Sequence, residues 1–112
     1  MKIVFVSVWF SDKMGYIENC LPKALAALGQ EVHVISSTAQ VYFNDPFYKS
    51  VYEPYLGPNI SEQGSKMVDG FTLHRLDFGT LFGKMYIKGL INKLAEIKPD
   101  IVQVFDPFSF PT

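Results

Sequence analysis

The chain has only one cysteine, Cys20, among its 112 residues. A single cysteine cannot form an intrachain disulfide, and Cys20 has no companion ligands at the spacing of a structural zinc site. We therefore expect no bound metal, and we expect the protein to reside in the reducing cytoplasm.

An excess of charge of one sign is also lacking. The 10 Lys and Arg residues are balanced by 11 Asp and Glu residues, which gives a formal net charge of −1. Because acidic and basic residues are interleaved and no basic tract occurs, nothing in the sequence would attract nucleic acid. We expect no nucleic-acid partner.

Long hydrophobic runs are missing as well. The opening "MKIVFVSVWFSD" is apolar, but it falls well short of the roughly 20 residues that a membrane span requires. No small-residue cleavage site of a secretory signal follows it. Its β-branched and aromatic residues are typical of a buried strand, which is what we predict here.

Glycine-rich phosphate-binding motifs are absent too. The stretch "FSDKMGYIENC" follows the predicted first strand, and its one glycine is Gly15. A dinucleotide fingerprint needs three glycines at fixed spacing, and a Walker loop needs a Gly-Lys-Ser/Thr ending. Neither occurs, and we expect no nicotinamide or flavin cofactor and no nucleotide hydrolysis of the Walker type.

The sequence does contain an alternation of strand and helix signals. Residues 2–10 are predicted as a first strand, 17–28 as a helix that ends before Gly29, and 31–37 as a second strand. A strand, a helix and a strand in this order form a βαβ unit with parallel strands and a right-handed crossover.

Residues 38–69, which we refer to as the excursion, interrupt this alternation. They contain prolines, tyrosines and phenylalanines without a steady periodicity, and they are far longer than an ordinary connection. Such a segment is either an ordered functional excursion or a mobile one. Its aromatic content argues against plain disorder.

The second half of the chain continues the alternation. We predict a third strand over 70–78 after a turn at Asp69-Gly70, a second long helix over 83–100, and a fourth, central parallel strand over 101–108. One apolar stripe is expected along the helix, and its members are Ile87, Leu90, Ile91, Leu94 and Ile97.

The elements together predict an α/β fold, with an open, mostly parallel sheet and helices on both faces. Ligands of such sheets bind beyond the carboxyl ends of the strands, where the strand order reverses. Two segments are expected there, namely residues 11–16 after the first strand and residues 105–109 at the tip of the fourth.

Three stretches of the sequence resemble one known family. "KIVFVSVWFSDKMGYIENCLPKALAALGQEVHVISS" is similar to the opening βαβ unit of the N-terminal domain of family 4 glycosyltransferases, which have the GT-B fold. "DGFTLHRL" and "KPDIVQVFDP" continue the resemblance, the latter to the family's strand that begins with Lys-Pro-Asp and ends in an acidic residue and proline. The three stretches are spread over most of the chain, from residue 2 to residue 107.

This resemblance implies that residues 1–112 are an incomplete N-terminal Rossmann-like domain of a GT-B enzyme. Such enzymes move a sugar from a nucleotide-sugar donor to an acceptor with retention, and a saccharide or a lipid-linked acceptor is expected. The N-terminal domain is the acceptor side, while a second domain, absent from this chain, holds most of the donor. The fragment is therefore expected to be inactive alone and to need no cofactor. A lipid-linked acceptor would fit peripheral association with the inner membrane face.

The resemblance also implies substrate-binding roles at three positions. Gly15 and Met14 lie in the family's glycine loop, where Met14 replaces the first glycine of many members. Asp106 lies at the acidic position after the fourth strand. Gln103 and Phe105 replace histidines of the family, and phenylalanine cannot transfer a proton. We therefore assign no catalytic residue.

Simpler roles are open for several of these residues. Gly15 also suits an ordinary turn between strand and helix, and Asp106 suits a turn before Pro107. His33 and His74 are expected to be half-buried strand residues rather than ligands. The aromatic rings of the excursion either stack on acceptor sugars or pack the excursion onto the sheet.

Two other functions are open for the whole chain. One is a small stand-alone α/β binding or regulatory module without catalysis, whose open sheet edge a partner covers. The other is attachment to a membrane surface through Lys84, Lys88 and Lys93, which would share the basic face of the second helix.

Overall fold

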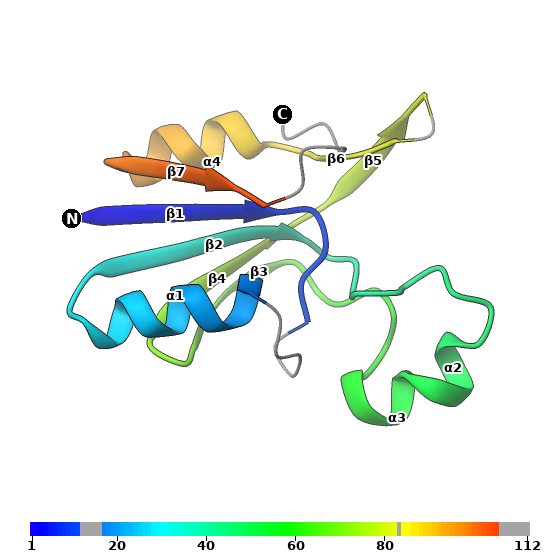
Figure 1. Cartoon of the computed structure of the whole chain (residues 1–112). Coiled ribbons are helices and arrows are strands. Elements are labelled where there is room, and N and C mark those ends of the chain that lie inside the picture. The colour runs from blue at the N-terminus through cyan, green and yellow to red at the C-terminus, as the bar shows by residue number, and fades with distance from the viewer. Residues whose placement is uncertain (12–16, 83, 106–112) are drawn as a thin grey trace.

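The computed structural model describes residues 1–11, 17–82 and 84–105 of the chain (Figure 1). In these residues five strands form one sheet in the order β3-β4-β2-β1-β7, and two strands form a second sheet, β5-β6. The strands are β1 (Lys2–Ser7), β2 (Glu31–Ser37), β3 (Gly64–Val68), β4 (Phe71–Leu76), β5 (Phe78–Leu81), β6 (Lys84–Ile87) and β7 (Ile101–Val104). The helices are α1 (Ile17–Ala27), α2 (Tyr48–Val51), α3 (Glu53–Leu56) and α4 (Leu90–Ile97).

The large sheet is mostly parallel, as the sequence predicts. β1 pairs in parallel with β2 on one side and with β7 on the other, and β2 pairs in parallel with β4. Only β3 runs antiparallel, in a hairpin with β4. The predicted turn at Asp69-Gly70 joins these two strands, and its φ values of 47° and 91° are those of a tight hairpin turn.

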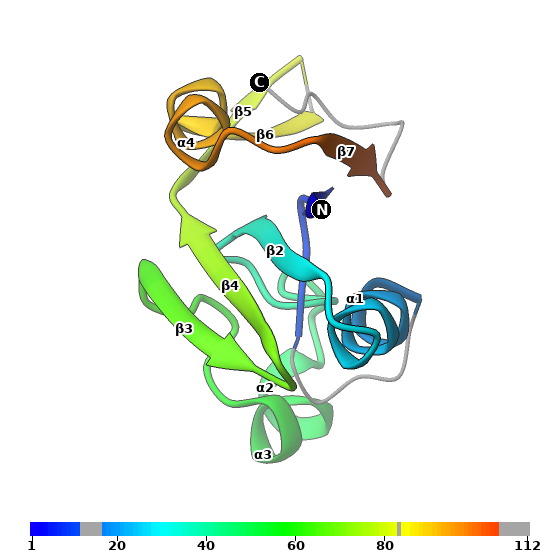
Figure 2. The same ribbon diagram turned by 90° about the vertical axis from the view of Figure 1, so that its left-hand side faces the viewer.

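Helices lie on both faces of the large sheet, as predicted. Figure 2 shows α1 on one face and α4, with the β5–β6 hairpin, on the other. The alternate side chains of β1 point to opposite faces. Phe5 belongs to the hydrophobic core under α1, whereas Val4 and Val6 belong to the core under α4. β1 is therefore buried on both sides, as expected for a central parallel strand.

The first strand is shorter than predicted because serine hydroxyls replace part of the backbone ladder after Ser7. The backbone carbonyl of Val8 accepts hydrogen bonds from the backbone amide and the hydroxyl of Ser37. The Ser7 hydroxyl donates to the carbonyl of Trp9 at 2.7 Å. Side chains of this kind compete with regular strand pairing. Burial nevertheless continues as far as Phe10.

The prediction of a helix over 83–100 is wrong for the first half of this segment. Residues 84–87 form β6, which pairs antiparallel with β5. Gly89 follows in the left-handed region, with φ of 78°, and α4 begins only at Leu90. Glycine adopts this conformation without the steric cost of a Cβ atom, and it lets the chain change direction between strand and helix. Pairing with a neighbouring strand has here overridden the helical periodicity.

The apolar stripe expected on this helix is divided between two elements. Ile87 is buried in the hairpin, and Leu90 and Ile97 of α4 are buried against the sheet. Ile91, by contrast, is 61 % exposed. The helical spacing therefore identified the buried positions of α4 only in part.

The basic helix face proposed for membrane attachment does not form. Lys84 lies in β6, Lys88 lies between β6 and α4, and only Lys93 lies in α4. Lys88 and Lys93 each have a carboxylate within 4 Å, on Asp77 at 3.7 Å and on Glu96 at 3.6 Å. None of the helices in the described ranges has the length and apolar character needed to cross a membrane.

The fourth strand was predicted to be central, and this prediction is wrong. β7 lies at an edge of the sheet. β7 pairs with β1, and no other described strand pairs with its outer side. Ile101, Val102 and Val104 are 46 %, 45 % and 38 % exposed. The apolar run that suggested a central strand is thus open on both faces in the described part of the chain.

The excursion includes α2, α3 and β3. Its rings pack against one another and against the β5–β6 hairpin: Tyr42 stacks on Tyr52 with ring centroids 5.0 Å apart, and Phe43 meets Phe78 edge to face at 5.7 Å. These contacts support the packing role considered for the aromatic residues.

The two neighbouring apolar residues of α4 provide a test of this fold. Leu90→Ala should lower the free energy of unfolding by about 2 to 4 kcal/mol, because it leaves a cavity in the core under α4. Ile91→Ala should change it by less than about 0.5 kcal/mol, because the side chain is exposed. Urea unfolding measures both values, and equal losses would contradict the placement of α4.

Candidate ligand site at the carboxyl edge of the sheet

The carboxyl ends of the parallel strands lie along one edge of the sheet (Figure 1). The order β4-β2-β1-β7 reverses at β1, because the chain adds β2 and β4 on one side of β1 and β7 on the other. Two successive parallel strands thus diverge at this point, which is where open α/β sheets bind ligands. This geometry agrees with the edge expected for the site.

The three predicted substrate-binding residues, Gly15, Met14 and Asp106, lie outside the described residues. Their described neighbours are Ser11, after β1, and Phe105, after β7. Because β1 and β7 are adjacent and parallel, both segments leave the sheet at the same edge.

Phe105 is held against the sheet. Its backbone amide donates to the carbonyl of Val6 at 2.9 Å, and its ring stacks on Phe5 with centroids 5.2 Å apart. Phe105 therefore has a packing role in the core under α1. Gln103 is exposed on β7, and its side-chain amide donates to the carbonyl of Val104 at 3.3 Å.

Ser11 connects the loop after β1 to the excursion and to α1. Its hydroxyl donates to Oε1 of Gln40 at 2.6 Å and accepts from the backbone amide of Val41 at 2.9 Å. Its carbonyl accepts from the side chain of Asn19 at 2.8 Å. Ser11 and Gln40 are both buried. This buried polar group was not predicted, since the sequence does not show which excursion residue reaches the loop.

Arg75 is a buried cation at the same edge. Its guanidinium donates from Nη1 to the carbonyl of Ser37 at 3.0 Å and from Nη2 to the carbonyl of Phe10 at 2.8 Å. Its Cζ atom also lies 5.9 Å from the centroid of the Phe10 ring. Arg75 thus holds the last residue of β2 and the segment that follows β1 at a fixed separation, as a planar fork of donors can.

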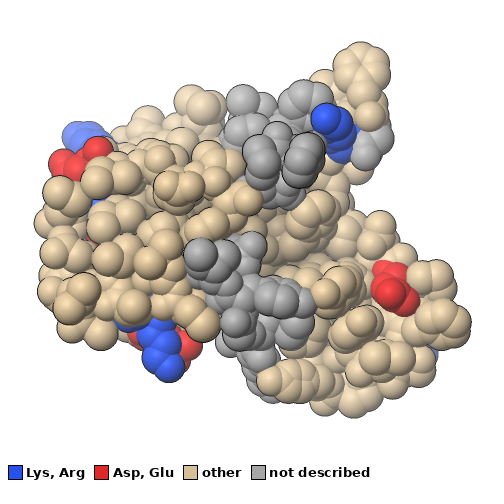
Figure 3. Space-filling model, in the orientation of Figure 1, with Lys and Arg blue, Asp and Glu red and all other residues tan. Residues whose placement is uncertain are grey.

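Residues of the excursion line two hollows. One, of about 510 Å³, is formed by the excursion, and its lining includes Asn44, Asp45, Lys49 and Glu53. The other, of about 320 Å³, is lined by residues 61–66 and Arg75. Figure 3 shows the surface indented between the excursion and the projecting β5–β6 hairpin. The amide, carboxylate and amine groups of the larger hollow suit a polar ligand.

Tyr48 lines the larger hollow as a hydrogen-bond donor. Burial, with the nearby carboxylate of Glu53, raises the pKa of the Tyr48 phenol above its ordinary value. The phenol therefore stays protonated at neutral pH and donates to the carbonyl of Gly57 at 2.9 Å. This bond closes the α2–α3 segment on itself.

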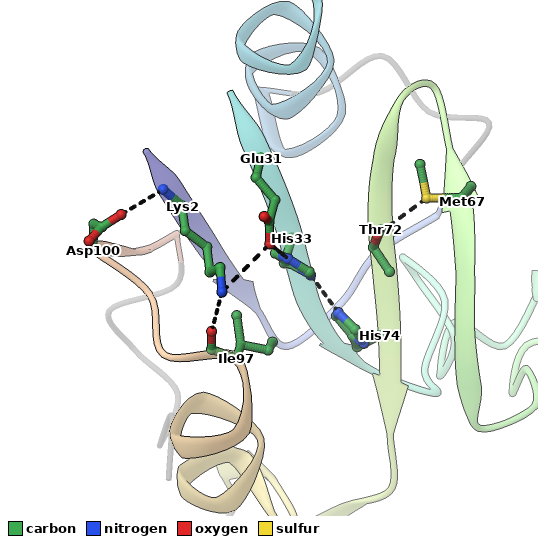
Figure 4. Close-up of polar contacts among 8 residues, drawn as sticks. All are labelled: Lys2, Glu31, His33, Met67, Thr72, His74, Ile97 and Asp100. Carbon is green, nitrogen blue, oxygen red and sulfur yellow. Dashed lines mark hydrogen bonds and ion pairs between the residues drawn. The ribbon is translucent and has the colours of Figure 1, made fainter. Parts of the chain in front are cut away.

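The two histidines, expected as half-buried strand residues rather than ligands, are in contact (Figure 4). Nδ1 of His33 lies 2.9 Å from Nε2 of His74, and the rings stack with centroids 5.1 Å apart. They are diagonal neighbours on β2 and β4, because His33 pairs with Thr72 and His74 pairs with Ile35. Only the register of two non-consecutive strands brings them together, and no local sequence signal reveals it. The described residues contain no group of three or more His, Cys, Asp and Glu that could hold a metal ion.

Removal of the Ser11 hydroxyl should loosen this edge. Ser11→Ala leaves the Val41 amide without its buried partner and should lower the free energy of unfolding by about 1 to 3 kcal/mol. Hydrogen exchange at residues 40–61 should be faster in Ser11→Ala than in the unaltered chain. Ser50→Ala, which removes an exposed hydroxyl, is the control and should change stability by less than about 0.5 kcal/mol. Equal effects of the two changes would refute the role given to Ser11.

Comparison with known proteins adds no relative. No family model matches the chain, and neither a curated protein nor a solved structure matches it. A functional proposal therefore depends on the strand order, the chemistry of the carboxyl edge and the resemblance in sequence.

Proposed function

We propose that this chain forms the acceptor side of the cleft of a retaining glycosyltransferase with the GT-B fold. In this proposal a second domain holds the nucleotide-sugar donor, and a saccharide or a lipid-linked acceptor binds at the carboxyl edge described above. The chain on its own would bind but not transfer a sugar.

The strand order is the observation that carries the proposal. A parallel sheet whose order reverses at β1 is the arrangement of the Rossmann-like domains that make up GT-B enzymes. The sequence resemblance places Gly15 and Met14 after β1 and Asp106 after β7, and these two strands are adjacent. The segments that would contact the ligand therefore start side by side.

The proposed roles follow from the chemistry of the residues. A glycine at position 15 would let the backbone approach a ligand closely, and amide donors at the start of α1 would suit a diphosphate. The Asp106 carboxylate would accept a hydrogen bond from a sugar hydroxyl. Neither Gln103 nor Phe105 can act as an acid or base near pH 7, and a proton transfer in the reaction would need a group from elsewhere.

A binding experiment tests the proposal on the chain as it exists. Amide chemical shifts would be followed by NMR during titration with N-acetylglucosamine, maltose and uridine diphosphate as probes. We expect weak binding, with dissociation constants on the order of 1 mM, and shifts confined to residues 9–19 and 104–107. The absence of shifts with every probe, or shifts confined to other strands, would overturn the proposal.

Asp106→Asn should weaken saccharide binding about tenfold, because an amide replaces a charged acceptor. Asp77→Asn is the matched control, since Asp77 is exposed beside the β5–β6 hairpin, and it should leave the titration unchanged. If both changes act equally, Asp106 has no specific role in binding.

The exposed edge of β7 favours the second function considered for the chain, a binding module whose partner covers that edge. Sedimentation velocity distinguishes a glycosyltransferase fragment from a stand-alone binding module. A severed half of a larger enzyme should self-associate through β7, and Val102→Lys should reduce this association, because charge on an edge strand opposes further pairing. A stable monomer or one defined oligomer would favour the module.

A further inference from the structure

The β5–β6 hairpin ends in an apolar tip. Leu81, the last residue of β5, pairs with Lys84, the first residue of β6, and only residues 82 and 83 separate them in the chain. Leu81 is 52 % exposed and Phe82 is 89 % exposed. Figure 3 shows the hairpin projecting from the body of the molecule. Two adjacent apolar side chains therefore reach solvent at the end of a projection.

The base of the hairpin is packed, in contrast to its tip. Met85 and Ile87 belong to the core under α4, and Phe78 packs against that core. Gly79 pairs with Tyr86 across the hairpin, and a Cβ atom at position 79 would collide with the Tyr86 ring. The ring thus covers the glycine backbone, which is a known means of fixing the register of a hairpin. The base therefore holds the tip in one place.

The backbone of Phe82 lies in the left-handed region, with φ of 53°. This conformation is strained for a bulky residue. Two-residue hairpin loops favour Asn-Gly, Asp-Gly or Gly-Gly, because these residues tolerate it. Phe82 therefore opposes the turn, and at 89 % exposure its ring adds little to the core. Strain at a residue that neither the turn nor the core requires is typical of a site that binds something.

The shape of the tip favours a bilayer over a protein as its partner. A stable protein interface buries about 800 Å² on each side and involves about 20 to 30 residues of each partner. A projecting loop of two apolar residues supplies only a small part of that area. A bilayer demands no matching shape, and its head-group region accepts apolar and aromatic side chains from one small projection.

The charges of the hairpin suit an anionic lipid surface. Lys84 is the one charged residue in the sequence from 78 to 87, which contains no Asp or Glu. The carboxylate of Asp77, just before β5, lies 3.7 Å from the amine of Lys88 and is balanced by it. An exposed lysine beside an apolar tip can place its amine among phosphate groups while its methylene groups lie along the apolar surface.

We propose that the tip formed by Leu81, Phe82 and Lys84 is a lipid-binding site, which inserts its two apolar side chains into the head-group region of an anionic bilayer. This site differs from the basic helix face, which does not form. It also does not depend on the proposed sugar transfer. Because only two apolar side chains enter the lipid, the contact is weak and reversible.

Co-sedimentation with vesicles tests this site on the full chain. The chain should bind vesicles of phosphatidylcholine mixed with phosphatidylserine, and about fivefold more weakly vesicles of phosphatidylcholine alone, because Lys84 gains from anionic lipid. Absence of binding to the mixed vesicles would overturn the proposal and would direct the search to a protein partner. No sugar is present, so this result is independent of the saccharide titration.

Two matched substitutions show whether the tip is responsible. Phe82→Asn should weaken binding to the mixed vesicles at least about tenfold, because the ring no longer enters the lipid. Phe47→Asn makes the same change at another exposed phenylalanine, which precedes α2 and is 68 % exposed. It should leave binding unchanged. Equal losses in the two variants, or no loss in Phe82→Asn, would overturn the proposal.

The strain at position 82 separates a loss of binding from a loss of folding. Phe82→Asn should unfold at the same urea concentration as the unaltered chain or at a higher one, because asparagine adopts the left-handed region more easily. If it is less stable, a second variant decides. Trp9 is the only tryptophan, so Phe82→Trp combined with Trp9→Phe reports on the tip alone. Its emission should shift to shorter wavelength on the mixed vesicles, and unchanged emission of the bound chain would overturn the proposal.

Discussion

The burial of β1 on both faces is the constraint on which the rest of the structure depends. Its alternating side chains enter two separate cores, one under α1 and one under α4. A strand of this kind needs a neighbour on each side and a helix on each face, because its backbone groups and both rows of side chains must leave water together. β2 and β7 meet the first need, and the two helices meet the second.

That arrangement also creates the candidate site. β2 and β7 lie on opposite sides of β1. The connecting segments therefore diverge at the carboxyl edge of the sheet and fill the space there. Here polar side chains hold those segments: Ser11 and Gln40 join the first loop to the excursion, while Arg75 binds the carbonyls of Phe10, after β1, and of Ser37, the last residue of β2. These hydrogen bonds hold the edge in one arrangement, as a preformed site requires.

Strong local patterns were predicted well, and pairings between distant segments were not. The second strand, Glu31–Ser37, and the Asp69-Gly70 turn agree with the prediction, since alternation and left-handed turn residues are local signals. The helix over 83–100 failed in its first half because β6 found a partner in β5, and a period of 3.6 cannot be separated from a short strand over four residues. The histidine contact requires the register of β2 and β4, which no window of sequence contains.

The sequence by itself determined the alternation of strands and helices, the parallel βαβ opening, and the exclusion of glycine-rich cofactor motifs, because each depends on neighbouring residues. Its resemblance to a known family also predicted substrate-binding roles for Gly15, Met14 and Asp106. Only the tertiary structure decided that β7 lies at an edge, that Ser11 binds the excursion, and that His33 and His74 are in contact. These features arise from contacts between residues far apart in the chain, and such contacts form only when the whole sheet is assembled.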